Sequence, residues 1–205
     1  MRLYYAPRTI SVATAIALEE AGLAYDPVLV DFASAEQTKP AYLTLNPKGR
    51  VPALETDDGT LLTETGALLE YIAALAPAAG LIPQAPEEAA QMRSVMYYLA
   101  STMHVNHAHM RRGSRWASQQ SSFDDMAAMA PTTMAASAQF FTDHCLRGDF
   151  VMGAQISLAD PYAFVVCNWL EGDNVSLRDF PQIASYLDRM RARPSVRAVT
   201  AQGML

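Results

Sequence analysis

Hydroxyl side chains stand where two helices are predicted to begin, a position that suits the binding of anions. Thr9 and Ser11 flank the predicted start of a helix over residues 10–21, and Thr65 opens another predicted helix. The first N–H groups of a helix have no intrahelical acceptor, so an anion can bind there. The same residue types serve routinely as helix N-caps. The residues alone therefore leave both roles open, a structural cap and a ligand contact.

The histidines and cysteines do not combine into a metal site. On a helix, His104 and His107 share a face while His109 points elsewhere, and no nearby carboxylate completes a set of three ligands. Cys145 and Cys167 are too few for a cysteine-based metal site or a disulfide framework. Both fall in apolar helical stretches, so we expect them to be buried as small hydrophobic residues and expect no metal.

The first third of the chain predicts a small mixed sheet with helices packed on it. Apolar runs predict four strands, at residues 3–5, 25–32, 51–56 and 60–62. The acidic turn Asp57-Asp58-Gly59 between the last two runs is a hairpin signal. Helical patterns cover residues 10–21, 36–46 and a stretch from Thr65 to about Pro77. The expected order is β-α-β-α-β-β-α.

The rest of the chain predicts helices only. A linker over residues 77–86 precedes expected helices over 86–112, 123–146, 157–171 and 180–192. We therefore expect an α/β domain over residues 1–77 and an all-helical domain over residues 86–205. The first of these helices carries a stripe of methionines that predicts a core face more than a ligand pocket: Met92, Met96, Met103 and Met110.

A capping box is predicted at the start of the helix over residues 157–171. Ser157 and Asp160 have its spacing, with Asp in place of the usual Glu. Its expected role is structural. Pro161 follows directly, and we expect it to remove one intrahelical hydrogen bond.

Composition and charge exclude several classes of protein. Hydrophobic residues make up 51% of the 205 residues and charged residues 18%, which excludes wholesale disorder. Acidic residues outnumber basic ones by 21 to 15, and this balance disfavours nucleic acid as a partner. No apolar stretch approaches the roughly 20 residues of a membrane span, and no apolar segment follows Arg2 as in a signal peptide. We expect a cytoplasmic protein that does not enter membranes.

Three segments of the chain together carry a family pattern: LYYAPRTISVATAIALEEAGLAY, NPKGRVPALETDDGTLLTET, and the stretch from MGAQISLADPYAF to FPQIASYLDRMRARPSV. They resemble the cytosolic glutathione transferases, most closely the bacterial beta class. The pair Val51-Pro52 followed by Glu64-Thr65 is the most specific signal, and RPSV after an amphipathic helix adds to it. The resemblance covers most of the chain. It implies a thioredoxin-like N-terminal domain, a helical C-terminal domain and a homodimer.

The resemblance implies attack of the glutathione thiolate on a small hydrophobic electrophile, with glutathione as co-substrate. Ile10 stands where beta-class enzymes carry cysteine, so a mixed disulfide with glutathione is impossible there. Ser11 matches the adjacent serine of that pattern and is the first candidate to stabilise the thiolate. Thr9, which matches the serine of theta- and delta-like enzymes, is the second and Tyr5 the third; a site without a side-chain donor is the remaining alternative.

A hydrogen bond from one such hydroxyl is strong enough to lower the pKa of the glutathione thiol. Lowering a thiol pKa by about two units requires roughly 2.7 kcal/mol of selective thiolate stabilisation. A hydrogen bond to a charged acceptor contributes about 1.5–3 kcal/mol.

The resemblance also assigns the contacts that hold glutathione. Pro52 occupies the family's cis-proline position, which would turn the backbone N–H and C=O of Val51 toward the cysteinyl part. The hydroxyl and N–H of Thr65 would hold the γ-glutamyl carboxylate, and Glu64 the α-ammonium group. Plain helix capping at Thr65 is the alternative.

Three further residues have expected roles. Lys48 and Lys39 are candidates for the glycyl carboxylate, although a lysine in water is the usual case. His104 matches a histidine near the active site of beta-class enzymes. The electrophile is expected between the domains, against apolar residues of the helix over residues 86–112.

Two other functions fit the same pattern. One is a glutathione-dependent isomerase or dehalogenase on the same scaffold. The other is a non-catalytic interaction module that resembles a transferase, which the replacement of the family's cysteine by Ile10 motivates.

Overall fold

The computed structural model describes residues 1–205 and divides them into two compact units. The first comprises Met1–Ile82 together with Arg191–Leu205, and the second comprises Pro83–Met190. This differs from the expected division into residues 1–77 and 86–205, because the last segment of the chain joins the first unit and not the helical one.

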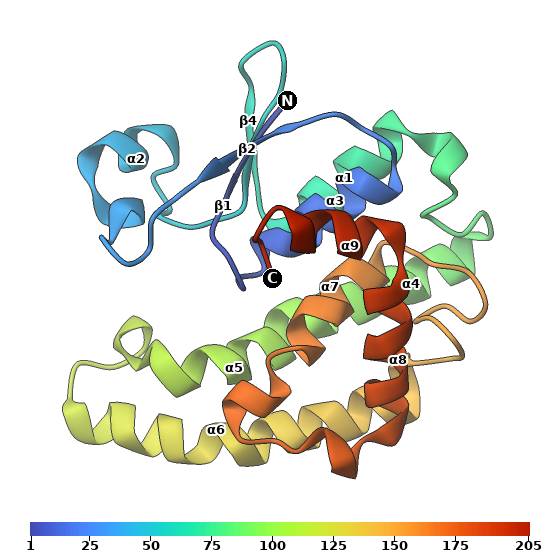
Figure 1. Ribbon diagram of the computed structural model, residues 1–205. Helices are drawn as coiled ribbons and strands as arrows, with labels where there is room; N and C mark the ends of the chain where they lie inside the picture. Colours follow the sequence, from blue (N-terminus) through green and yellow to red (C-terminus); the bar gives the residue numbers. More distant parts are fainter. The chain divides into compact units, whose positions relative to one another are not determined.

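The first unit is built on a four-stranded mixed sheet in the order β2-β1-β3-β4 (Figure 1). The strands are β1 (Arg2–Tyr5), β2 (Asp26–Leu29), β3 (Ala53–Glu55) and β4 (Leu61–Thr63). Strand β1 pairs in parallel with β2 and antiparallel with β3, and β3 and β4 form the hairpin that the acidic turn predicts. Together with its helices, this is the expected thioredoxin-like arrangement.

Helices cover both faces of this sheet. They are α1 (Ser11–Glu20), α2 (Pro40–Leu45), α3 (Thr65–Leu75) and α9 (Pro194–Ala201). In Figure 1, α1 and α3 lie on one side of the sheet and α2 on the other. The expected helix over residues 36–46 is divided, because a 3₁₀ turn at Glu36–Thr38 precedes α2.

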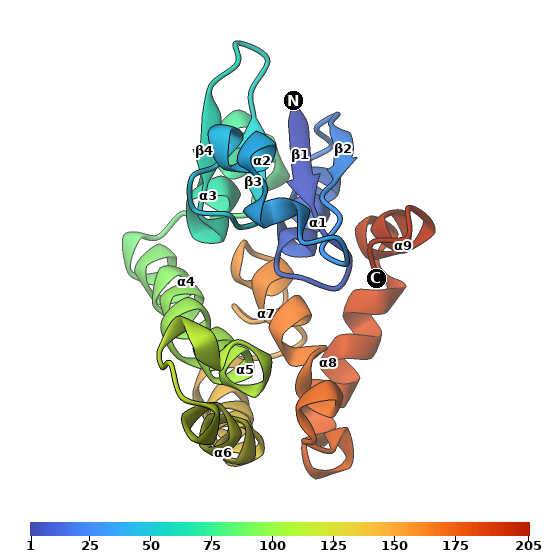
Figure 2. The same cartoon turned by 90° about the vertical axis from the view of Figure 1, so that its left-hand side faces the viewer.

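Helix α1 is the central helix of the first unit. Every residue from Ser11 to Leu18 is buried, as expected of a helix that is covered on all sides. The sheet, α3 and α9 supply the cover, and α9 lies beside α1 in Figures 1 and 2.

A charged cluster fastens α9 to the last turn of α1. The guanidinium of Arg193 donates two hydrogen bonds to the carboxylate of Glu20, at 2.6 Å from Nε and 2.8 Å from Nη2. The hydroxyl of Ser195 donates to the same carboxylate. These contacts give the RPSV segment its role, and they explain why the last residues belong to the first unit.

We expect Glu20→Gln to lower the free energy of unfolding by about 1.5–3 kcal/mol at neutral pH, because it removes the charge that receives these hydrogen bonds. Burial raises the pKa of Glu20, but the hydrogen bonds from Arg193 and Ser195 and the guanidinium charge outweigh it, so the pKa lies below 4.5. The stabilisation is therefore present above pH 4.5 and lost as the pH falls through the folded value. Urea unfolding at several pH values measures it. A deficit that persists unchanged in strong acid would contradict this origin.

The second unit contains five helices, α4 to α8. They are α4 (Pro86–Tyr98), α5 (His104–Arg111), α6 (Gln120–Phe140), α7 (Ala159–Cys167) and α8 (Pro181–Ala192), the last of which runs into the first unit. Helices α5 and α6 pack side by side (Figures 1 and 2). The expected helix over residues 86–112 is interrupted by a π-helical turn at Leu99–Met103. No helix is long and apolar enough to cross a membrane.

Most of the methionine stripe belongs to the core of this unit. Met92, Met96 and Met103 are buried, as the spacing predicts. Cys145 and Cys167 are buried as expected, and burial raises the pKa of the Cys145 thiol to about 11 and that of the Cys167 thiol further. Neither thiol is ionised at neutral pH, so both behave as small apolar residues.

The predicted capping box is present in altered form. The carboxylate of Asp160 accepts the N–H of Ser157 at 2.7 Å and the hydroxyl of the same serine at 2.9 Å. It also accepts the N–H of Val151 at 2.8 Å. The expectation about Pro161 is wrong: α7 begins at Ala159, so Pro161 falls in the first turn, where an N–H would have no intrahelical acceptor anyway.

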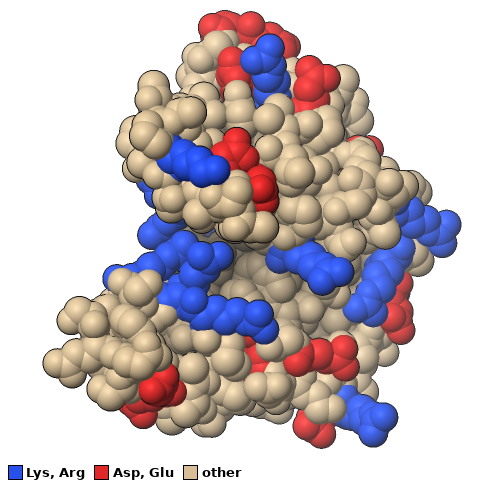
Figure 3. All heavy atoms as spheres, turned by 60° about the vertical axis from the view of Figure 1, so that its left-hand side comes forward, with Lys and Arg blue, Asp and Glu red and all other residues tan.

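Charge is unevenly spread over the surface. Acidic side chains gather at the top of the view in Figure 3, where Figure 1 places the turn between β3 and β4. This turn contains Asp57 and Asp58, and the ammonium of Met1 lies 2.6 Å from a carboxylate oxygen of Asp57.

Candidate active site

The register of the sheet brings three of the predicted site segments to one end of it. Tyr4 pairs with Ala53, and Ala53 pairs with Thr63. Because β1 and β4 both run antiparallel to β3, the segment after β1, the segment before β3 and the segment after β4 meet at the same edge. This register therefore brings together the loop with Thr9, the Val51-Pro52 pair and the Glu64-Thr65 pair.

The loop between β1 and α1 holds two hydroxyl groups in contact with each other. Thr9 Oγ1 and Ser11 Oγ are 2.7 Å apart. Thr9 Oγ1 lies 2.8 Å from the carbonyl oxygen of Ala6, and Ser11 Oγ lies 3.1 Å from the same oxygen and accepts the N–H of Ala6 at 3.1 Å. Each hydroxyl has one proton to donate. When the proton of one hydroxyl points out of the loop, the oxygen of that hydroxyl can still accept a hydrogen bond from the other.

The two hydroxyls differ in access. Ser11 is fully buried, whereas Thr9 is partly exposed. Of these two residues only Thr9 has exposed surface, whereas Ser11, the first candidate from the sequence, has none. Tyr5, the third candidate, is a largely buried residue of β1 with 9% of its surface exposed.

The start of α1 adds a donor that sequence reasoning missed. Ile10 is the N-cap of α1, and its backbone N–H makes no hydrogen bond within the chain. In the sequence Ile10 stands out only as the replacement of the family's cysteine. The signal that could have found it is its place at a helix N-terminus, where N–H groups are unpaired whatever the side chain.

The peptide bond between Val51 and Pro52 is cis, as predicted. Neither the N–H nor the C=O of Val51 is hydrogen-bonded within the chain. The preceding carbonyl, of Arg50, is fixed by two donors at 2.8 Å each, the Tyr42 hydroxyl and the Asn46 side-chain amide. Tyr42 and Asn46 therefore position this segment. Asn46 begins one of the segments that carry the family resemblance, but the sequence alone indicates no role for Asn46 or for Tyr42.

A lysine and a glutamate meet at the start of α3. Thr65 is its first residue and is 7% exposed, and Glu64 before it has a left-handed φ of 73°. The ammonium of Lys48 lies 2.5 Å from Glu64 Oε1 and 2.9 Å from Thr63 Oγ1. The α3 N-terminus thus carries unpaired N–H groups, a hydroxyl and a neighbouring cation. Such a set can hold a carboxylate.

Lys39, the other lysine, stands apart from this cluster. It is exposed, precedes α2, and its ammonium lies 3.3 Å from the hydroxyl of Ser34. The structure therefore brings Lys48, and not Lys39, to Glu64 and Thr65.

Comparison with known proteins agrees with this geometry. Residues 1–74 match the family model of the glutathione S-transferase N-terminal domain, and residues 115–202 match that of the C-terminal domain. Glutathione S-transferase GstA of Escherichia coli O157:H7 is 30% identical over 212 aligned positions that cover 100% of both chains. The chain belongs to the glutathione S-transferase family.

Solved structures of this family confirm the expected fold. A glutathione transferase homologue from Sulfitobacter with bound glutathione is 65% identical, with a TM-score of 0.98 over 100% of this chain and 98% of that one. A beta-class glutathione S-transferase from Sphingomonas chungbukensis is 32% identical, with a TM-score of 0.85 over 100% of both chains. The maleylacetoacetate isomerase of Pseudomonas aeruginosa is 30% identical over 96% of this chain and 94% of that protein.

In the helical unit of this transferase, His104 belongs to an aromatic cluster. Its ring centre lies 5.0 Å from that of Trp169 and 6.5 Å from that of His107. His107 stacks on Trp169 at 4.0 Å, and its Nδ1 lies 2.7 Å from a carboxylate oxygen of Asp173, which is 1% exposed. His104 and His107 share a face as their spacing predicts. Asp173 carried no sequence signal, because its contact is made across a long stretch of chain.

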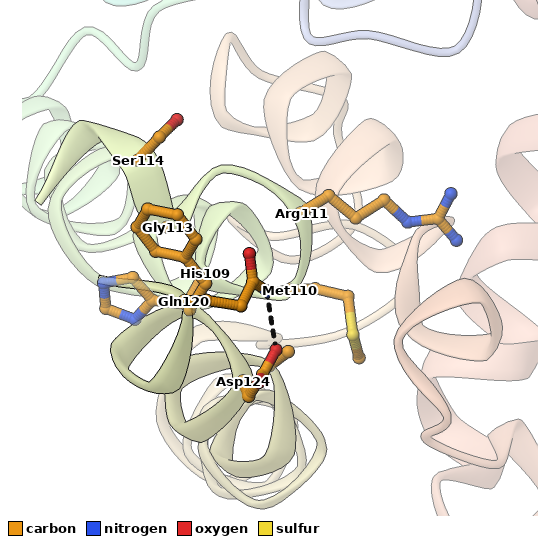
Figure 4. A pocket seen from close by; sticks show the side chains of 9 residues that line it. His109, Met110, Arg111, Gly113, Ser114, Gln120 and Asp124 are labelled. Carbon is orange, nitrogen blue, oxygen red and sulfur yellow. Dashed lines mark hydrogen bonds between the residues drawn. The ribbon is translucent and has the colours of Figure 1, made fainter. Parts of the chain in front are cut away.

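His109 points elsewhere, also as predicted, and lines a pocket of about 320 Å³ between the end of α5 and the start of α6 (Figure 4). Met110 lines it too, so the last methionine of the stripe is not a core residue. A Cβ on Gly113 would come within 3.0 Å of Phe123, so only glycine allows this close approach. Gln120 donates to Asp124 at 2.8 Å, and Arg111 points away from that pair in Figure 4.

Proposed function

We propose that this transferase binds glutathione at the sheet edge of its first unit and conjugates it, as a cytoplasmic homodimer, to a small hydrophobic electrophile. The observation that carries the proposal is the convergence of three features at one edge: the Thr9 hydroxyl, the unpaired backbone groups of Val51 and the start of α3 at Thr65. The Sulfitobacter homologue with bound glutathione supports the choice of ligand.

In this proposal the sulfur of glutathione lies at the start of α1. The Thr9 hydroxyl and the N–H of Ile10 donate to the thiolate, and both stabilise it over the thiol. Ser11 acts through Thr9: its proton goes to Thr9 Oγ1 or to the Ala6 carbonyl when the Thr9 proton points at sulfur. The thiolate then attacks the electrophilic atom, forms the carbon–sulfur bond and displaces the leaving group.

The rest of glutathione extends along the edge of the sheet. Val51 pairs with the cysteinyl backbone through its N–H and C=O. Thr65 and the first N–H groups of α3 hold the γ-glutamyl carboxylate, and Glu64 holds the α-ammonium group. Lys48 offsets the charge of Glu64 and reaches the glycyl carboxylate if that salt bridge opens. The proposed roles of Lys39, Tyr5 and His104 stay predictions.

The homodimer is implied by the family resemblance, and the helical unit offers apolar surface for it. Tyr97 on α4 is 65% exposed, and Met129 and Phe140 on α6 are 49% and 44% exposed. Side chains of this kind are enriched in the cores of protein interfaces.

Calorimetric titration with glutathione tests the proposal. We expect saturable binding at or below millimolar glutathione, and Thr65→Val to weaken it about tenfold, which corresponds to about 1.4 kcal/mol for a lost hydrogen bond to a carboxylate. The control is Thr200→Val in the same unit, an exposed residue whose hydroxyl bonds only to its own helix. Absence of binding at millimolar glutathione would overturn the proposal.

A glutathione-dependent isomerase is the second candidate, and the likeness to the Pseudomonas aeruginosa maleylacetoacetate isomerase favours it. Product analysis separates the two, because conjugation consumes glutathione whereas isomerisation returns it. A non-catalytic module would bind glutathione and show no turnover with a chlorinated aromatic electrophile.

A further inference from the structure

The loop with Thr9 contains a backbone conformation that its own residues do not favour. Pro7 and Arg8 occupy the second and third positions of a turn from Ala6 to Thr9, and Arg8 has a left-handed φ of 59°. A turn with Pro second and a left-handed residue third has the pattern of a type II turn, which favours glycine at the third position. An arginine there needs support from outside the turn.

A segment far away in the sequence gives that support. The N–H of Arg8 donates to the carbonyl oxygen of Met204 at 2.8 Å. Met204 is fully buried, so its backbone is held in place by packing and not only by this bond. The hydrogen bond lies one residue from Thr9, the partly exposed residue that is proposed to contact the sulfur.

The end of α9 is built to present this carbonyl. Gly203 has a left-handed φ of 73°, and its N–H donates to the carbonyl oxygen of Thr200 at 2.9 Å. The N–H of Met204 donates to the carbonyl oxygen of Val199 at 3.1 Å. These two bonds form a Schellman motif, which ends a helix and reverses the chain. Val199 and Met204 are both fully buried, as the hydrophobic contact of that motif requires.

The other end of α9 is fastened to the same helix that the loop precedes. Glu20, in the last turn of α1, binds Arg193 and Ser195 at the start of α9. Helix α9 is therefore fixed to the end of α1 at one side and to the loop before α1 at the other. Movement of the Met204 carbonyl relative to α1 is restricted from both directions.

We propose that Gly203 and Met204 position the thiol-binding loop, so that they tune the ionisation of bound glutathione without touching it. The inference rests on the proposed function for the role of Thr9 toward glutathione. The effect of the chain end on the conformation of the loop does not depend on that function. The Met204 carbonyl acts through its hydrogen bond to the Arg8 N–H, which stabilises the left-handed turn. That turn then orients the Thr9 hydroxyl and the Ile10 N–H toward the sulfur. Gly203 and Met204 are positioning residues.

The test compares Met204→Ala with Met204→Leu and with the control Arg197→Ala, an exposed residue of α9. Ultraviolet absorbance against pH gives the apparent pKa of the bound glutathione thiol. We expect Met204→Ala to raise it by about half a unit to one unit, which lowers the thiolate fraction roughly three- to tenfold below the pKa. Met204→Leu and Arg197→Ala are expected to leave it unchanged. If Met204→Ala lowers thermal stability but not this ionisation, the residue is only structural and the proposal is wrong.

A double-variant cycle tests the route through Arg8. Arg8→Gly removes the unfavourable left-handed arginine, so Met204→Ala should shift the thiol pKa less in the Arg8→Gly background than in the wild type. An equal shift in both backgrounds would contradict the route. Should Met204→Ala fail to fold, Gly203→Ala replaces it: a Cβ there meets nothing within 4 Å, so only the left-handed φ is disturbed.

Amide hydrogen exchange separates this inference from the proposed function. Exchange at the amides of Ala6, Arg8, Thr9 and Ile10 is expected to accelerate in Met204→Ala without glutathione and to stay unchanged in Arg197→Ala. If the wild type binds no glutathione, the proposed function fails while the exchange result still judges the contact between chain end and loop. If exchange is unaffected, the inference fails even when glutathione binds.

Discussion

Thr9→Val is expected to lower kcat/KM for conjugation about ten- to one-hundredfold at pH 6.5, since a hydrogen bond to a charged acceptor contributes about 1.5–3 kcal/mol. Valine keeps the shape of threonine and removes the hydroxyl, which is the proposed donor to sulfur and also accepts the N–H of Ser11 at 3.3 Å. The loss should appear as a raised pKa of the bound thiol, because the hydroxyl stabilises the thiolate and not the thiol. The measurement is a pH–rate profile together with the absorbance titration of bound glutathione.

The deficit of Thr9→Val has a definite pH dependence. Below the pKa of the bound thiol, the rate follows the small fraction of thiolate, so a raised pKa lowers it in proportion. Above about pH 8.5, where a free thiol ionises without help, the deficit should shrink. A deficit that stays constant up to pH 9 would point to altered binding of the electrophile and would contradict a role in ionisation.

Ser11→Ala is the matched comparison. Because Ser11 is fully buried and its proton reaches Thr9 Oγ1, we expect a smaller effect on the thiol pKa, and none in the Thr9→Val background. The substitution also leaves the N–H of Ala6 without its side-chain acceptor, so both variants are compared below their unfolding temperatures. If Ser11→Ala raised the thiol pKa strongly and Thr9→Val left it unchanged, Ser11 would be the donor to the thiolate. Normal ionisation in both variants would leave the N–H of Ile10 as the stabilising group.

The features that the sequence predicted correctly depend on short stretches of chain. The Asp57-Asp58-Gly59 turn fixes a hairpin by its own conformation, and Val51-Pro52 in its flanking motif indicates the cis bond. Strand order follows once these are placed, because a hairpin and a β-α-β unit allow few arrangements in one sheet. The convergence of the site segments at one edge is a consequence of that order.

The features that it did not predict depend on contacts between distant residues. Ser11 and Thr9 are chemically similar and equally close to the helix start, and only packing in the folded protein buries one and exposes the other. Helix α9 is too short to be stable by itself, and its place is set by Glu20, which lies far away in the sequence. The boundary of the units and the role of Met204 follow from that docking.

The second large effect is expected at Asp160. Asp160→Ala should lower the free energy of unfolding by about 3–5 kcal/mol, because it leaves buried donors unpaired at about 1–3 kcal/mol each. Those donors are the N–H of Val151 and the N–H and hydroxyl of Ser157. The Tyr186 hydroxyl bonds to the backbone carbonyl of Asp160 and is retained. Urea unfolding measures the loss, and a loss below 1 kcal/mol would mean that the segment closes around alanine.

Asp149→Ala is the control for this change. Asp149 lies between α6 and α7, in the segment that also contains Val151 and Ser157, but its side chain is 69% exposed and its nearest cation, on Arg189, is 3.6 Å away. Exposed ion pairs contribute about 0–1 kcal/mol. The contrast between the two aspartates therefore separates the buried network from a general sensitivity of the loop between α6 and α7.

The pH dependence of Asp160 should have the opposite sign to that of Glu20. Burial raises the pKa of Asp160 from 3.8 to about 6, and the hydrogen bonds from Val151 and Ser157 lower it only in part. The folded protein then binds a proton more tightly than the unfolded chain, so the contribution of this group is greatest below pH 3.8 and falls as the pH rises through 6. The stability of the wild type minus that of Asp160→Asn isolates the group, since asparagine does not titrate. This difference should decrease from pH 3.8 to about 6 and stay level above it; an increase over that range would show that the hydrogen bonds outweigh burial.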